Sequence, residues 1–457
     1  MKKMNFLKRT QCLQSAALIC VILMIISLIR TSALLPGVSE EADRQKNEAR
    51  EKMYQKEYVR GRILDREGNI LAMSKKPEGK RIYNNPLAYS SVLGYWSVKY
   101  GAYGLEKTFN DVLLHSASGK GEKRGADVSL TLDDRLQTAA YELLSSSTGS
   151  AVVLKVKTGE ILALASSPSF NANKIEENWE EFSQKEGIFL SNAYQNPVAP
   201  GSVFKLVSSK AILEEGIDRE TVEDEGKLVV NGQTIRNYNG IAHGRISFTE
   251  GFVKSSNVYF MDRALKMGAA RMQEAADSFL LGKDIPLDFA TIKSTFSLGD
   301  GEDNVLAATA FGQGETLVTP LHMAMITQSI ANEGKMLKPY LIQSVVNGKG
   351  KTMEEGKTEE LTETMEKEIA EKLRRVMTKA GESYGMETID GKEIAAKTGT
   401  AQRGDGTNNA WLVTFAPADD PEYVIVLNRL KTKEIGKSLA PAAEALYEIL
   451  WEDEARQ

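Results

Sequence analysis

The chain has 457 residues, of which 42% are apolar and 26% charged, enough for one large domain and a smaller one. Its net charge is −5, and its 57 Lys and Arg residues are spread along the chain, which argues against a nucleic-acid partner. Both cysteines, Cys12 and Cys20, lie near the N-terminus, and His115, His243 and His322 form no closely spaced pair. The sequence therefore predicts no bound metal and no cofactor.

An apolar run, roughly residues 13–29, follows a basic segment at residues 2–9. This charge pattern places the basic end inside the cell and the remainder outside. At about 17 residues the run is at the lower limit for a spanning helix. We expect residues 1–35 to form an uncleaved single-pass anchor in the cytoplasmic membrane, with the rest of the chain on the extracytoplasmic side. A signal peptide cut near residues 31–33 is the alternative.

The segment after the anchor is charged and then turns to short apolar strands. Glu40–Lys56 has no Gly or Pro and predicts a solvated helical stalk, with a flexible linker as the alternative. Arg62–Leu64 and Ile70–Ala72 predict a β-hairpin around the turn Asp65–Asn69. We assign residues 36–125 to the stalk and a small β-rich front module.

The remainder, residues 126–457, predicts an α+β domain with one sheet whose edges come from both ends of the domain. Strands open the domain, helices fill its middle, and strands with a closing helix end it. The predicted strands are Ala151–Val156, Ile161–Ala165, Ala410–Phe415 and Tyr423–Leu427, and the predicted helices are Asp133–Leu144, Leu321–Asn332, Glu366–Lys379 and Pro441–Trp451.

Ser202 and Lys205 form a Ser-x-x-Lys pattern that occurs once in the chain, directly after Pro200-Gly201. The Pro-Gly pair predicts that Ser202 begins a helix, and the spacing of three brings the Lys205 amine within reach of its hydroxyl. A serine nucleophile needs a base, and a lysine partly removed from water has a lowered pKa suited to that role. By itself, the pattern is more typical of a surface helix.

Ser255 and Asn257 form a Ser-x-Asn pattern further along the chain. A hydroxyl and an amide two positions apart can move a proton and orient a substrate peptide group. The same pattern at Ser169–Asn171 precedes the nucleophile, and we interpret it as a loop after a hairpin.

Lys397, Thr398 and Gly399 form a Lys-Thr-Gly pattern, followed by Thr400. The lysine charge and threonine hydroxyl can hold a carboxylate, and the glycine is expected to leave space for a ligand along a strand. A second copy, Lys157–Gly159, lies at the predicted tip of a hairpin, where these residues are ordinary turn formers.

The three patterns in this order are the signature of penicillin-recognising serine acyltransferases. Nearly the whole chain after residue 60 resembles class B penicillin-binding proteins, in particular the short penicillin-binding protein A type. Asn409 is a departure, because relatives often have His there, and we assign it no role. The other stretches that carry the resemblance are Arg60–Arg66, Gly104–Glu106, Leu130–Asp133, Leu136-Gln137, Phe311–Gly314 and Thr319-Pro320.

The resemblance implies a penicillin-binding transpeptidase fold, in which an antiparallel sheet is sandwiched by helices. It implies a peptidoglycan D,D-transpeptidase that cross-links stem peptides. Ser202 would attack the carbonyl of the penultimate D-alanine while Lys205 takes its proton, and Ser255 would pass a proton to the departing D-alanine.

The resemblance also implies which residues hold the substrate. Asn257 would hold the amide of the donor strand, and Lys397 and Thr398 its terminal carboxylate. Backbone N–H groups of Ser202 and Thr400 would form the oxyanion hole. A β-lactam antibiotic would acylate the same serine and stay attached.

About 90 residues between the start of the stalk and the catalytic domain are too few for a glycosyltransferase. We therefore expect a polytopic membrane glycosyltransferase as a partner, by analogy with class B relatives. A membrane-attached β-lactamase-like hydrolase is one alternative, although such enzymes are usually shorter and released. A non-catalytic cell-wall scaffold or β-lactam sensor is another, and the three intact motifs argue against it. The sequence leaves elongation, division and sporulation open.

Overall fold

A computed structural model describes residues 51, 53, 55–114, 123–386 and 388–454. The predicted anchor at residues 13–29 and most of the predicted stalk lie outside this range. Within it, no helix combines the length and the apolar composition needed to cross a bilayer.

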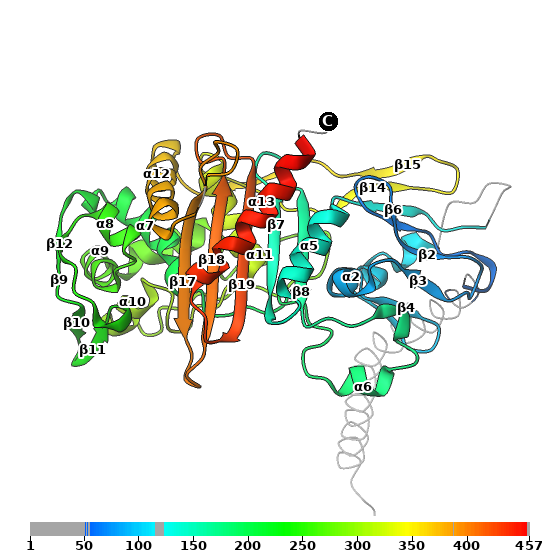
Figure 1. The fold of residues 1–457 in the computed structure, drawn as a ribbon, viewed down its shortest axis with the longest axis horizontal. Helices are drawn as coiled ribbons and strands as arrows, with labels where there is room; N and C mark the ends of the chain where they lie inside the picture. Colours follow the sequence, from blue (N-terminus) through cyan, green and yellow to red (C-terminus); the bar gives the residue numbers. More distant parts are fainter. Residues whose placement is uncertain (1–50, 52, 54, 115–122, 387, 455–457) are drawn as a thin grey trace, which may run out of the picture.

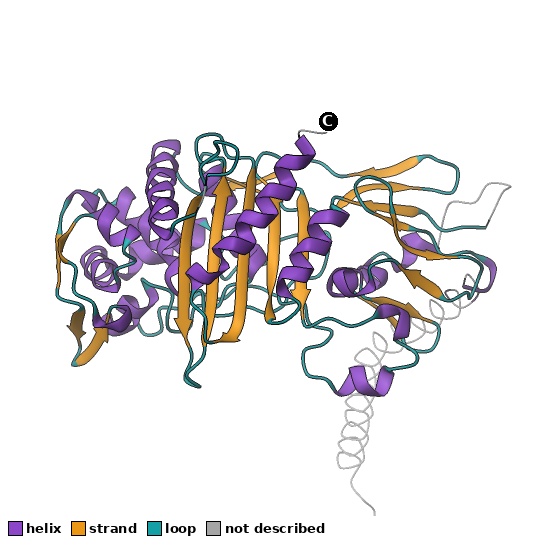
Figure 2. Cartoon of the chain, in the orientation of Figure 1, coloured by secondary structure: helices purple, strands orange, loops and turns teal. Residues whose placement is uncertain are grey.

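A five-stranded antiparallel sheet forms the centre of the larger domain (Figures 1 and 2). Three neighbouring strands of this sheet come from the C-terminal part of the chain. The other two form the hairpin that was predicted near the start of the domain. The predicted sheet with edges from both ends of the domain is therefore confirmed. In order across the sheet, the strands are β17 (Ala395–Gln402), β18 (Asn408–Ala416), β19 (Tyr423–Thr432), β7 (Thr148–Lys155) and β8 (Ile161–Ser167).

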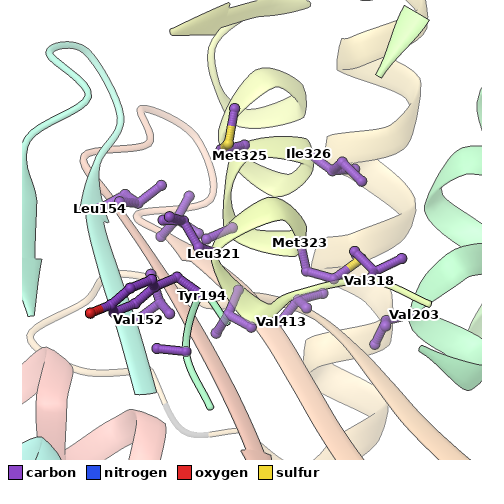
Figure 3. Close-up of a cluster of buried hydrophobic side chains, with 14 of the residues drawn as sticks. Val152, Leu154, Tyr194, Val203, Val318, Leu321, Met323, Met325, Ile326 and Val413 are labelled. Carbon is purple, nitrogen blue, oxygen red and sulfur yellow. The ribbon is translucent and has the colours of Figure 1, made fainter. Parts of the chain in front are cut away.

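Helices cover both faces of this sheet: α5 (Asp134–Leu144) and α13 (Ala440–Glu454) lie on one face, and α11 (Pro320–Ala331) on the other (Figure 1). Alternate residues of a strand point to opposite faces. Accordingly, Leu412 of β18 packs in the cluster with α5 and α13, whereas Val413 packs against α11 (Figure 3). The α+β class and the sheet sandwiched by helices are confirmed, and the four predicted helices are present with shifted ends.

The helical half of the domain lies beside β17 (Figure 2). The helix α12 packs against β17, and α7 packs against α9. Two small two-stranded sheets, β9–β12 and β10–β11, close the outer end. The elements are α7 (Lys205–Glu214), β9 (Val222–Asp224), β10 (Lys227–Val230), β11 (Gln233–Arg236), β12 (Gly244–Ile246), α8 (Phe248–Val253), α9 (Asn257–Ser278), α10 (Asp303–Thr309) and α12 (Lys367–Tyr384).

The front module contains a six-stranded sheet, in which the predicted hairpin of β1 and β2 is confirmed. This sheet also takes β6, β14 and β15 from the chain beyond residue 125, so it is not confined to the predicted front segment. In order, its strands are β15 (Thr352–Glu355), β14 (Ile342–Val346), β6 (Asp127–Leu130), β1 (Ile63–Leu64), β2 (Ile70–Ser74) and β3 (Arg81–Tyr83).

Shorter elements complete the chain. They are α2 (Pro86–Leu93), β4 (Tyr95–Ser97), β5 (Gly101–Tyr103), α3 (Leu105–Thr108), α4 (Asn110–Leu114), α6 (Trp179–Gln184), β13 (Lys335–Leu337) and β16 (Glu360–Glu363).

A buried ionic group ties the front module together. The Glu106 carboxylate accepts from Nε of Arg60 and from Nε of Arg81, both at 2.7 Å, and all three side chains are at most 2% exposed. Burial opposes ionisation of Glu106, but the two guanidiniums outweigh it and lower the pKa of the carboxyl group. The segment before β1 is thereby joined to β3 and α3.

Candidate active site

Ser202 lies in a 3-10 helix, Gly201–Phe204, that leads directly into α7. The φ of Gly201 is 55°, a left-handed conformation that glycine adopts without steric cost, and its N–H donates to the Gly312 carbonyl at 3.0 Å. A Cβ at Gly312 would lie 2.1 Å from the Gly201 carbonyl oxygen, so no larger residue fits. The predicted position of Ser202 at a helix start is confirmed.

Lys205 begins α7, and its amine is surrounded by oxygen atoms. Nζ lies 2.6 Å from the Ser255 carbonyl oxygen, 2.9 Å from Asn257 Oδ1, 3.1 Å from Ser202 Oγ and 3.2 Å from Ser255 Oγ. A neutral amine has two N–H donors and one lone pair. If the donors serve the Ser255 carbonyl and Asn257, the lone pair remains for the Ser202 proton.

The surroundings of Lys205 favour this neutral form. The side chain is fully buried. Burial, and after it the positive charge of Lys397, lower the pKa of Lys205 well below that of a free lysine, although Asp224 opposes the shift. The amine is therefore better suited to act as a base than that of an ordinary lysine.

Ser255 lies in the loop between α8 and α9 with an unusual backbone conformation. Its φ is 55°, which costs a residue other than glycine about 1 kcal/mol or more. In this conformation its carbonyl and hydroxyl oxygens both reach Lys205, and the hydroxyl also accepts from Lys397 Nζ at 2.9 Å. The loop therefore carries strain at the point where the candidate catalytic groups meet.

A buried polar network holds this loop in place. The Ser256 hydroxyl donates to Asp224 at 2.6 Å. Asn237 donates to both oxygens of Asp224, at 2.8 and 2.9 Å, and its own Oδ1 accepts from the Asn257 N–H at 2.8 Å. The sequence did not predict Asp224 or Asn237, because no local pattern marks them and they reach the loop only through the fold.

Lys397 lies on β17 and is fully buried. Its amine donates to the Ser255 hydroxyl at 2.9 Å, to the Tyr384 hydroxyl at 3.2 Å and to the Thr398 carbonyl at 3.2 Å. Tyr384, the last residue of α12, is a third contributor that the sequence did not predict. The carboxylate-binding role of Lys397 implied by resemblance stays a prediction.

A groove of about 860 Å³ opens over Ser202, and Thr398, Gly399 and Thr400 of β17 line it. A Cβ at Gly399 would lie 2.9 Å from the Pro200 carbonyl oxygen. This glycine thus allows the nucleophile turn to pack against β17, a different reason from the ligand space that the sequence suggested. The structure brings together all the predicted site residues: Ser202, Lys205, Ser255, Asn257, Lys397, Thr398, Gly399 and Thr400.

The second copies of two motifs lie elsewhere, as predicted. The Ser169 hydroxyl donates to the Tyr141 hydroxyl at 3.0 Å, and Asn171 caps a short 3-10 helix. Residues 157–159 form the turn between β7 and β8. Neither copy lines the groove.

Histidines and acidic residues form no metal centre in the part of the chain that the structure describes, where no group of three or more potential ligands is found. His322 is buried in the core, with Nδ1 2.9 Å from Ser294 Oγ and Nε2 2.8 Å from the Phe279 carbonyl oxygen. His243 lines the groove without a neighbouring ligand set.

The fold and this arrangement define a serine acyltransferase. The family model of the penicillin binding protein transpeptidase domain matches residues 149–450, about two thirds of the chain, and that of the penicillin binding protein A dimerisation domain matches residues 60–129. The chain belongs to the penicillin-binding protein transpeptidase family, which confirms the predicted resemblance.

Relatives and solved structures agree with this assignment. Peptidoglycan D,D-transpeptidase PbpA of Mycolicibacterium smegmatis is 29% identical over 404 residues, which cover 79% of this chain and 82% of the relative. PbpA of Mycobacterium tuberculosis is 30% identical over 410 residues, with the same coverage. The imipenem acyl-enzyme of penicillin-binding protein A from M. tuberculosis has a TM-score of 0.81 at 27% identity, covering 86% of this chain and 98% of that one. A D,D-transpeptidase domain from Eggerthella lenta has a TM-score of 0.81 at 30% identity, covering 88% and 100%.

Proposed function

We propose that this chain is a peptidoglycan D,D-transpeptidase that cross-links stem peptides through an acyl-enzyme on Ser202 and has no glycosyltransferase activity of its own. The observation that carries the proposal is the contact of the Ser202 hydroxyl, at 3.1 Å, with a buried lysine amine whose pKa is lowered. Relatives about 30% identical are named as such enzymes, and solved neighbours are β-lactam acyl-enzymes.

Acylation would begin with the neutral amine of Lys205. As Ser202 Oγ forms a bond to the carbonyl carbon of the penultimate D-alanine, Lys205 takes the hydroxyl proton. Collapse of the tetrahedral intermediate breaks the peptide C–N bond. The proton on Lys205 passes through the Ser255 hydroxyl to the leaving nitrogen. D-alanine therefore departs with an uncharged amino group, and the neutral amine of Lys205 is regenerated.

The second half-reaction would use the same groups in reverse. An amine of a neighbouring strand attacks the Ser202 ester, forming a new amide bond and breaking the C–O bond. The attacking amine loses a proton through Ser255 and Lys205, and the Ser202 oxygen regains one. Products are the cross-linked peptide and the free serine.

Substrate binding would follow from the walls of the groove. Thr398 and Lys397 would hold the terminal carboxylate of the donor, and Asn257 its amide. The N–H groups of Ser202 and Thr400 would receive the developing oxyanion. Gly399, between Thr398 and Thr400, allows β17 to lie close to the turn that carries Ser202.

We further propose that residues 1–35 anchor the protein as a single pass in the cytoplasmic membrane, with the catalytic domain on the extracytoplasmic side. The basic start followed by the apolar run at residues 13–29 supports this orientation. A polytopic membrane glycosyltransferase would supply the glycan strands as a partner, because the front module is too small to hold that activity.

Intact-mass measurement of the full-length chain with benzylpenicillin, beside the Ser202→Ala variant, tests the proposal. We expect a stable adduct of one drug molecule on the wild type and none on the variant. Drug consumption without a lasting adduct would indicate a β-lactamase-like hydrolase instead. No reaction of either drug or protein would favour a non-catalytic scaffold.

A further inference from the structure

The groove over Ser202 has an unusual charge. Its lining includes Arg236, Lys254 and Lys437, all three with exposed side chains, and no Asp or Glu among the described residues. Over the whole chain, acidic residues outnumber basic ones, 62 to 57. The charged side chains that line the groove are therefore all positive, although the molecule as a whole is acidic.

These three cations form no ion pairs in the described structure. Within the described part of the chain, none of them is within ion-pair distance of an acidic side chain. The acidic residues nearest to Lys254 and Lys437 in the sequence have other partners: Glu250 accepts from Ser247 at the start of α8, and Glu434 accepts from Arg429 at 2.6 Å. Hydrogen bonds from Ser247, and after them the charge of Lys254, lower the pKa of Glu250, but Glu250 and Lys254 form no ion pair. The positive charge of the groove is thus available to a ligand.

The cations flank the candidate catalytic residues on two sides. The Arg236 carbonyl accepts from the Asn257 side-chain amide at 2.9 Å, and Lys254 directly precedes Ser255. On the other side, Lys437 follows Gly436, whose N–H donates to Thr400 Oγ1 at 3.2 Å. A peptide bound between Asn257 and β17 would pass within the field of all three.

We propose that this groove selects stem peptides that carry free side-chain carboxylates upstream of the two D-alanines, in addition to the terminal carboxylate. The inference rests on the proposed transpeptidase function and names its substrate class. A concave surface lined by one sign of charge concentrates field lines and favours ligands of the opposite sign. Peptides whose side-chain carboxyls are amidated lose this attraction and react more slowly.

Three penicillins that share one nucleus test the inference. Benzylpenicillin has an uncharged side chain, carbenicillin adds a carboxylate to it and ampicillin an amine. We expect the wild-type full-length chain to be acylated faster by carbenicillin than by ampicillin. Reversing one charge in Arg236→Glu or Lys254→Glu weakens the interaction with carbenicillin and strengthens that with ampicillin. Because each exposed interaction contributes about 0.2–1 kcal/mol, the rate ratio should fall by about fourfold or more.

Because the ratio compares carbenicillin and ampicillin on the same variant, a general loss of reactivity cancels. Lys351→Glu, the same charge reversal in the exposed turn between β14 and β15, is the matched control and keeps the wild-type ratio. If both groove variants keep the wild-type ratio of carbenicillin to ampicillin acylation rates, the inference is wrong. Failure of benzylpenicillin to acylate the wild type would instead show that the proposed function itself is wrong.

A second measurement uses the substrate class directly. A stem pentapeptide with free side-chain carboxyls should protect Ser202 from benzylpenicillin at a severalfold lower concentration than its amidated counterpart, and the difference should shrink at high salt. Equal protection by the two peptides at low salt would also overturn the inference.

Discussion

The hydroxyl of Ser255 lies between two lysine amines, 3.2 Å from Nζ of Lys205 and 2.9 Å from Nζ of Lys397. Both amines are fully buried, and their mutual repulsion contributes to the lowered pKa of Lys205. A hydroxyl in this position can accept a proton from one side and donate one on the other. It thus connects the base beside Ser202 with the strand that lines the groove.

Replacement of Ser255 by alanine should lower the rate of acylation by benzylpenicillin about 10²–10³-fold, because the proton path to the leaving group is lost. Stopped-flow or mass-spectrometric acylation rates measure this effect. Ser169→Ala, in the second Ser-x-Asn copy, is the matched control and should react at the wild-type rate. A Ser255→Ala rate within a few-fold of wild type would remove this serine from the proton path.

Acylation should rise with pH as Lys205 loses its proton. Because burial lowers the pKa of this group, the midpoint of the rise lies well below the ordinary lysine value of 10.5. Arginine stays charged at every accessible pH. Lys205→Arg should therefore lower the acylation rate about 10³-fold or more and abolish its increase with pH. Lys210→Arg is the control within α7, where Lys210 pairs with Glu214 at 2.6 Å. A midpoint near 10.5 would contradict the neutral base.

We expect Asp224 to be a positioning residue, because it accepts hydrogen bonds from Asn237 and Ser256. Asp224→Asn should lower the acylation rate about tenfold, because the loop that carries Ser255 is held less well. Asp224 also raises the pKa of Lys205. Loss of its charge should therefore shift the pH–rate midpoint to lower pH, a change that loosened packing alone would not produce. Asp277→Asn, near the C-terminal end of α9, should leave rate and midpoint unchanged.

The sequence predicted the central sheet and the catalytic motifs well, for physical reasons. β7 and β8 contain the apolar runs Ala151–Leu154 and Ile161–Ala165 on either side of a Gly-containing turn, a local signal for a buried hairpin. The residues within each motif are close in the sequence because each motif lies within one local element. The first lies at a helix start, the second in a loop and the third on a strand. Their residues could thus be named before the fold showed that they meet.

Other features left no local signal. All four residues of β15, Thr352–Glu355, are exposed and three are polar, so the pairing of β15 in the front sheet depends on β14 rather than on an apolar pattern of its own. Asp224 and Tyr384 contribute through contacts with residues far away in the chain. Such long-range partners cannot be read from spacing.

The buried carboxylate of Glu106 should be essential for the front module. Glu106→Gln leaves Arg60 and Arg81 without a compensating charge in the interior, which should lower the free energy of unfolding by about 3–5 kcal/mol. Denaturant unfolding of the full chain measures this. Glu360→Gln breaks a pair with Lys335 in which both side chains are about half exposed, and should have little effect. Equal effects of the two changes would contradict the structural role of Glu106.

The buried imidazole of His322 should make the fold sensitive to mild acid. Its Nε2–H donates to the Phe279 carbonyl, its Nδ1 accepts from Ser294, and burial lowers the pKa of His322 from 6.5 to about 4. Between these values the unfolded chain binds a proton that the folded chain does not, so stability falls as the pH drops from 6.5 to about 4.

For one group with this shift, the loss between pH 7 and pH 4.5 is about 2–3 kcal/mol. His322→Gln removes the titrating group while keeping a side chain that can donate and accept. The variant should be less stable than wild type at pH 7, because the packing is altered, yet lose about 2–3 kcal/mol less between pH 7 and pH 4.5. Other acid-sensitive groups act equally on both proteins and cancel in the comparison. Parallel pH profiles of unfolding free energy for the two proteins would show that His322 is not buried in its neutral form.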